Sequence, residues 1–146
     1  MMPRPTSENA VVKKLDWTRG ELAEGLRCYR AGEFFAAHEH WEAVWLELQD
    51  AEKTFLQGLI QVAAAFHHFQ RGNREGTSSL LRAALRRLDP CSPSFGGISV
   101  TPLCQEIGQW LKALEAGDTL SHRPFPQIVS LSFTHTERPT KADELG

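Results

Sequence analysis

One stretch of the sequence, residues 32–48 (GEFFAAHEHWEAVWLEL), predicts a helix that is apolar over most of its circumference. Wound at 100° per residue, Trp41 and Trp45 fall within about 60° of His38 around the helix axis, and Glu42 follows His38 by one turn on the same face. The apolar side chains on and beside that face are Phe34, Phe35, Trp41, Trp45 and Leu46. A helix that is apolar almost all round must be covered by other elements, so we expect the rest of the domain to pack around it.

The polar pair set into this apolar face has two interpretations. Burying an unpaired carboxylate is costly, so Glu42 is expected to be paired or protonated if it lies inside, and His38 at i−4 is within reach. In the first interpretation His38 and Glu42 form a buried hydrogen-bonded pair that fixes how the helices pack. In the second they are ligands or acid–base groups of a functional site.

The overall composition is that of an ordinary globular domain. The 146 residues are enough for one domain with a real core, and contents of 41% hydrophobic and 23% charged residues fall in the usual range. A net charge of −2 provides no global basic field for nucleic acid or an anionic membrane. The local exception is a basic cluster on one expected helix, formed by Arg82, Arg86 and Arg87, and such clusters are more often solvated faces. Neither nucleic acid nor a membrane is therefore the expected partner.

The three cysteines, Cys28, Cys91 and Cys104, are odd in number and widely spaced, which fits neither a disulfide framework nor a zinc motif. We interpret them as reduced thiols of a cytoplasmic protein, with Cys28 and Cys104 acting as small core residues. The first 14 residues lack the apolar segment of a secretory signal. No window approaches the ~18 uninterrupted apolar residues of a transmembrane helix, so none is expected.

Apolar periodicity predicts an all-α fold, a compact bundle of about five helices built from antiparallel helical hairpins. The expected helices cover residues 18–30, 32–48, 52–70, 74–88 and 102–116. Gly32 and Gly72 end the helices before them, Asn73 is an N-cap, and Thr101 is a further N-cap before Pro102. The domain is expected at residues 15–117, after a disordered N-terminus (1–14) and before an irregular C-terminal tail (118–146). Within that tail, residues 127–133 alternate enough for a short extended segment that docks on the bundle.

A faint repeat at an offset of 40 residues relates Ala31-Gly32 to Arg71-Gly72 and suggests two stacked helical hairpins. A polar stripe also marks the third expected helix, where Gln57, Gln61 and His68 fall within about 40° of one another. We expect this stripe to face His38 and Glu42 of the preceding helix, forming one polar cluster. The alternative is that the glutamines point to solvent. His67, about 100° away from His68, is expected outside the cluster.

Metal binding is one chemistry that such a cluster offers. His38 and Glu42 at i,i+4 spacing supply two ligands, and His68 supplies a third, leaving the fourth position to water. The order His38-Glu39-His40-Trp41-Glu42 superficially resembles the zinc-protease motif His-Glu-x-x-His, but Glu42 replaces the second histidine. Nucleophilic catalysis has less support, because neither Cys28 nor Cys104 has a histidine nearby in the sequence.

Several motifs together resemble domain of unknown function 309, a family of bacterial and plastid proteins. They are GEFFAAHEHWEAVW, FLQGLIQVAAAFHHFQRGN and the loop SFGGISV before the last helix, within residues 22–114. The resemblance implies a compact all-helical domain. Some members are labelled predicted metal-dependent hydrolases, and for this chain that label implies a metal-assisted hydrolysis. The motif positions are Gly32, Glu33, Phe34, Phe35, His38, Glu39, Glu42, Trp45, Gln57, Gly58, Gln61, His68, Gly72 and Asn73. Among them the family pattern marks Glu39 as a possible base, and Ser99 departs from it where an acidic residue is usual.

Three functions follow from these residues. The first is a small helical domain with a structural polar cluster, acting as a scaffold or interaction module. The second is a metal-dependent hydrolase with His38, Glu42 and His68 as ligands and Glu39 as the catalytic base. The third, nucleic-acid binding through the arginine face, is disfavoured by the net charge. Whether the chain is an enzyme stays open, as do a divalent-metal cofactor, the identity of a protein or small-molecule partner, and the oligomeric state.

Overall fold

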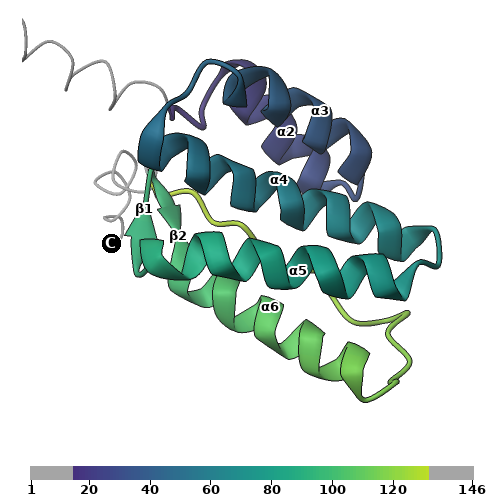
Figure 1. The fold of residues 1–146 in the computed structure, drawn as a ribbon. Coiled ribbons are helices and arrows are strands. Elements are labelled where there is room, and N and C mark those ends of the chain that lie inside the picture. Colours follow the sequence, from purple (N-terminus) through teal and green to yellow (C-terminus); the bar gives the residue numbers. More distant parts are fainter. Residues whose placement is uncertain (1–14, 132–146) are drawn as a thin grey trace, which may run out of the picture.

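The computed structural model describes residues 15–131, which form five α-helices, one 3-10 turn and a two-stranded antiparallel hairpin. The elements are α2 (Gly20–Arg30), α3 (Phe34–Trp45), α4 (Asp50–Gln70), α5 (Arg74–Leu88), η1 (Asp89–Cys91), β1 (Ser94–Phe95), β2 (Ile98–Ser99) and α6 (Val100–Glu115). Each helix packs on the next in chain order (Figure 1). The expected all-α bundle of about five helices is confirmed.

Two of the helix hairpins close in the same way. Gly32 ends α2 with φ +79°, and Gly72 ends α4 with φ +81°, a left-handed conformation that glycine adopts without steric cost. The residue after each glycine donates its backbone N–H five residues back, from Glu33 to the carbonyl of residue 28 (2.8 Å) and from Asn73 to that of residue 68 (2.9 Å). The two hairpins α2–α3 and α4–α5 therefore share the closure that the repeat at an offset of 40 residues suggests.

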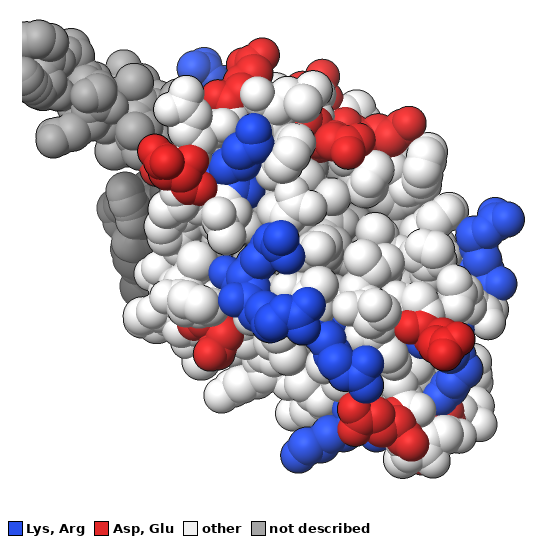
Figure 2. Space-filling view, in the orientation of Figure 1, with Lys and Arg blue, Asp and Glu red and all other residues white. Residues whose placement is uncertain are grey.

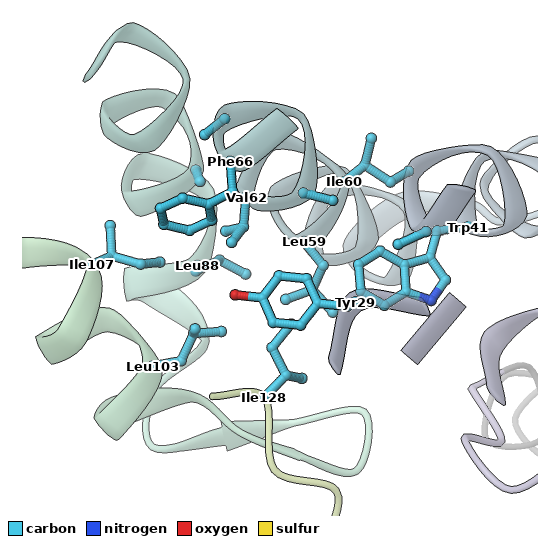
Figure 3. Close-up of a cluster of buried hydrophobic side chains, with 14 of the residues drawn as sticks. Tyr29, Trp41, Leu59, Ile60, Val62, Phe66, Leu88, Leu103, Ile107 and Ile128 are labelled. Atoms are coloured by element: carbon cyan, nitrogen blue, oxygen red, sulfur yellow. The ribbon is translucent and has the colours of Figure 1, made fainter. Parts of the chain in front are cut away.

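Helix α4 lies at the centre of the bundle, because it packs against α3 on one side and α5 on the other. The apolar stripe on its core side is fully buried, and its members are Phe55, Leu59, Val62 and Phe66. Trp41 of α3 is also fully buried, and its indole Nε1 donates to the Leu22 carbonyl of α2 (3.2 Å). Figure 3 shows the ring of Tyr29 in the middle of this core, beside Trp41.

The segment after α6 packs on the bundle as far as it is described. Leu120 and Ile128 are buried, and the ring of Phe125 stacks on Trp110 of α6 at a centroid distance of 5.5 Å. The backbone N–H of Ser99 donates to the Val129 carbonyl (3.0 Å), which aligns this segment with β2. The first half of the predicted tail thus contributes to the core. The predictions for residues 1–14 and 132–146 lie outside the described residues.

Two local expectations are wrong. Helix α6 begins at Val100 after Ser99, two residues earlier than predicted, so Thr101 is not its N-cap. Pro102 is tolerated there because the N–H groups of a first helical turn have no partner within the helix. Phe35 and Leu46 are 51% and 69% exposed, so the apolar circumference of α3 is less completely covered than expected. Across residues 15–131, no helix combines the length and the apolar character that crossing a bilayer requires.

Candidate functional site

The face of α3 around His38 carries an aromatic–histidine patch, formed by Phe35, His38 and His67. The ring of Phe35 stacks on the His38 imidazole at a centroid distance of 5.8 Å and an angle of 15°, and it contacts the His67 imidazole of α4 at 5.2 Å. His38 is half-buried, and its Nδ1 is buried without a hydrogen-bond partner among the described residues. The patch therefore joins α3 to α4 through three stacked or tilted rings.

The two carboxylates predicted for this site point away from the interior. Glu42 and Glu39 are both exposed. The interpretation of His38 and Glu42 as a buried hydrogen-bonded pair is therefore wrong. Because the neighbours of α3 cover its Phe34 and Trp41 side, the two carboxylates keep their hydration and have no need of a buried partner.

The polar stripe of α4 faces α5, and the expectation that it faces α3 is wrong. The Gln61 Oε1 accepts from the Arg87 Nη1 at 3.3 Å. Gln57 lines a recess of about 300 Å³ whose other walls include Arg87 of α5 and Trp45 at the end of α3. The His68 Nδ1 lies 3.0 Å from the Asn73 Nδ2, in the link between α4 and α5. Gln61 and His68 therefore bond within the α4–α5 hairpin.

Gly58 explains why the polar stripe of α4 lies next to α5. A Cβ atom at Gly58 would lie 2.8 Å from side-chain atoms of Leu88, so the α5 backbone comes close at this point. Gln57 and Gln61 flank Gly58 on α4 and are carried to the same interface. The helix that comes close beside the stripe is therefore α5.

His67, expected outside the polar cluster, is the histidine of α4 that lies beside His38. Desolvation lowers the pKa of the His67 imidazole below its ordinary value, and the positive charges of Arg71, His68 and His38 lower it further. His38, His67 and His68 therefore lie near enough for their charges to interact. The neutral imidazole of His67 is favoured in the folded protein.

A different group of side chains has the donor atoms of a metal site. The ligand-type atoms of Glu24, Cys28 and His40 all lie within 4.8 Å of one another. Among residues 15–131, His38, Glu42 and His68 do not form such a group. The sequence does not predict the group of Glu24, Cys28 and His40, because the histidine lies on α3 and the other two residues lie on α2. The i,i+4 spacing of Glu24 and Cys28 is the signal that was available.

The basic cluster of α5 lies at the surface. Figure 2 shows Lys and Arg side chains gathered over α5, with acidic side chains beside them. Arg82 pairs with Glu115 of α6 at 3.0 Å, Arg86 is exposed, and Arg87 donates to Gln61. Two of the three guanidinium groups thus have partners within the domain, in keeping with a solvated face.

Comparison with known proteins identifies the family that the chain resembles. Residues 22–80 match the family model described as Domain of unknown function (DUF309), so the expected resemblance is confirmed. An uncharacterized protein of Aquifex aeolicus (strain VF5) is 31% identical to this chain over 98 residues, which are 66% of this chain and 29% of that relative. The chain thus matches less than a third of the relative's length.

Proposed function

We propose that this chain, whose residues 22–80 match DUF309, is a helical interaction module that binds a protein partner through the aromatic–histidine patch. The observation that carries the proposal is the exposure of Phe35. This large aromatic side chain is 51% exposed, although its ring contacts the imidazoles of His38 and His67. Phenylalanine, with tyrosine and tryptophan, is enriched at the cores of protein–protein interfaces. Because the ring already rests on its neighbours, little conformational entropy is lost when a partner covers it.

The relative in Aquifex aeolicus supports the module interpretation. Its similarity to this chain occupies 29% of its length, as expected for a domain that works beside other parts of a longer polypeptide. The partner is then a folded protein surface with an apolar pocket for Phe35 and acceptors for the flanking imidazoles. A cytoplasmic setting, in which thiols stay reduced, suits the free cysteines Cys28, Cys91 and Cys104.

Site-specific photo-crosslinking tests the proposal. A benzophenone amino acid is placed at position 35 and, as a matched control, at the exposed Gln105 of α6, and crosslinked proteins are identified by mass spectrometry. The purified partner is then titrated with the wild type, Phe35→Ala and Leu46→Ala. Leu46 is 69% exposed on the helix end beyond the patch, so it controls for loss of apolar surface alone.

Phe35→Ala is expected to weaken binding at least ~10-fold and Leu46→Ala less than ~3-fold, as for an anchor and a peripheral residue. Both variants should keep the wild-type melting temperature within the small range usual for surface changes. The proposal is wrong if the two variants bind alike, or if position 105 captures the same protein as efficiently as position 35.

The second candidate function, a metal-dependent hydrolase, draws on the unpartnered Nδ1 of His38. A buried imidazole nitrogen without a partner is a candidate ligand or base, and Glu39 is the further candidate base. For His38 to share an ion with His68 and Glu42, these side chains would have to move, because the three do not group within residues 15–131. The metal content of untagged protein tests it, with His38→Ala beside His40→Gln. A metal that is lost in His38→Ala and kept in His40→Gln would favour the hydrolase, and the reverse pattern would exclude these ligands.

A further inference from the structure

The grouping of Glu24, Cys28 and His40 brings three kinds of donor atom together on the α2–α3 hairpin. Glu24 and Cys28 lie one turn apart on α2, and His40 reaches them from α3, with all three donor atoms within 4.8 Å of one another. In a tetrahedral zinc site with bonds of about 2.0–2.3 Å, neighbouring ligand atoms are about 3.5 Å apart. Small side-chain rotations therefore suffice to converge these three atoms on one ion.

The chemistry of the three donors selects the class of ion. A thiolate, an imidazole and a carboxylate are the ligands that Zn²⁺ takes in proteins, whereas Ca²⁺ and Mg²⁺ prefer oxygen donors throughout. Cys28 is 3% exposed and forms the floor of the group, while Glu24 is exposed and His40 half-buried. The three donors thus extend from the buried sulfur to a carboxylate at the surface.

The surrounding charges favour a cation. The Glu21 Oε1 contacts the His40 Nδ1, and a carboxylate in that position fixes the orientation of a ligating imidazole. Arg27 is the competing positive charge, since its Nη2 pairs with the Glu24 Oε1 at 2.7 Å and lies 3.9 Å from the Cys28 Sγ. That pair is largely exposed, and exposed ion pairs contribute little, so Arg27 can turn into solvent when the carboxylate takes up an ion.

We propose that Glu24, Cys28 and His40 bind a divalent cation with the ligand preference of Zn²⁺, that Glu21 positions the imidazole, and that water completes the coordination. The site is separate from the aromatic–histidine patch, and an ion held there links α2 to α3. The Cys28 thiol releases its proton to solvent when its sulfur bonds the ion.

Titration of the untagged full chain with Co²⁺ tests this site, because a cobalt–thiolate bond gives a charge-transfer absorption band that reports sulfur ligation directly. We expect one Co²⁺ per chain, a thiolate band, and displacement by Zn²⁺. Cys28→Ser should abolish the band. Glu24→Gln and His40→Gln, which change solvent-accessible side chains, should weaken binding at least ~10-fold without loss of folding. Glu21→Gln should weaken it by about 10-fold, as for residues that orient a ligand.

Matched controls come from the same chain. Cys104→Ser removes another buried thiol, His122→Gln removes an exposed histidine, and both should leave the cobalt titration unchanged. His38→Ala should also leave it unchanged, which separates this site from the hydrolase ligands. The proposal is overturned if the wild type shows no thiolate band, if the band survives Cys28→Ser, or if Glu24→Gln and His40→Gln bind as the wild type does. If Cys28→Ser does not fold, the latter two variants decide the question.

Discussion

The Tyr29 hydroxyl donates a buried hydrogen bond of 2.7 Å to the Pro126 carbonyl, across 97 residues of sequence. It joins α2 to the segment that follows α6. Two further hydrogen bonds also connect helix side chains to backbone carbonyls of this segment. The Arg30 Nη2 donates to the Ile128 carbonyl (2.8 Å), and the Trp110 Nε1 donates to the Pro124 carbonyl (3.0 Å). The C-terminal segment thus closes the bundle by bonding to its first and last described helices.

Replacing Tyr29 with Phe is expected to lower the free energy of unfolding by about 1–2 kcal/mol, because the buried Pro126 carbonyl is left without a donor. Urea denaturation followed by tryptophan fluorescence measures the change. Arg30→Gln is the control, since its bond to Ile128 is only partly buried and its loss should cost less. Equal stability of Tyr29→Phe and the wild type would mean that water replaces the tyrosine at this carbonyl.

The closeness of α4 and α5 at Gly58 gives a prediction with a contrasting control. Gly58→Ala should destabilise the protein by about 1–3 kcal/mol, because the added Cβ meets Leu88 at 2.8 Å in a filled core. Gly108→Ala in α6 should stabilise it by about 0.5–1 kcal/mol, because no atom lies within 4 Å of the added carbon and alanine is the better helix former. Thermal melts of both variants check the signs, and a stabilising Gly58→Ala would contradict the close helix approach.

The helices follow directly from the sequence, and the reason is local. Stripes such as Leu103, Ile107 and Leu111 repeat at helical spacing, and glycines such as Gly72 mark where the spacing stops. These signals need no knowledge of the neighbouring elements. The predicted start of α6 is two residues late, because proline fits anywhere in the first turn of a helix and Pro102 therefore does not mark the first residue.

The arrangement of the polar residues was less predictable, because it depends on which helix covers which side of α4. The angles around the axis correctly group Gln57 with Gln61 and separate His67 from His68. They contain no information on whether α3 or α5 meets each side, so the expectation that Gln61 faces α3 is wrong. Likewise, the proximity of Cys28 to His40 arises from the α2–α3 packing and has no signature in either helix alone.

The N-cap of α5 provides a prediction about the α4–α5 link. The Asn73 Oδ1 accepts from the Gly76 backbone N–H at 2.9 Å, as expected from the sequence. Asn73→Ala should therefore cost about 0.5–2 kcal/mol of stability, and Asn73→Asp, which keeps an acceptor oxygen, should recover most of it. Chemical denaturation of the pair measures the difference, and identical midpoints would show that water caps this helix equally well.

The aromatic–histidine patch predicts a pH dependence. The pKa of His67 is lowered in the folded protein by desolvation and by the nearby positive charges, so the unfolded chain binds a proton there more readily. Its contribution to stability is fully present above the unfolded value of about 6.5 and is lost as the pH falls below it. Between about pH 7.5 and pH 5.5, the wild type should therefore lose more stability than His67→Gln does.

Ring-proton NMR of His67 separates this effect from the other titrating groups. The titration midpoint should lie below the ordinary histidine value of about 6.5. It should rise in Phe35→Ala, because removing the ring that contacts the imidazole restores water to it. It should rise also in His38→Gln, which removes one of the repelling charges. A midpoint at or above about 6.5 in the wild type would mean that solvent reaches His67 freely, and the stacked geometry of the patch would then be wrong.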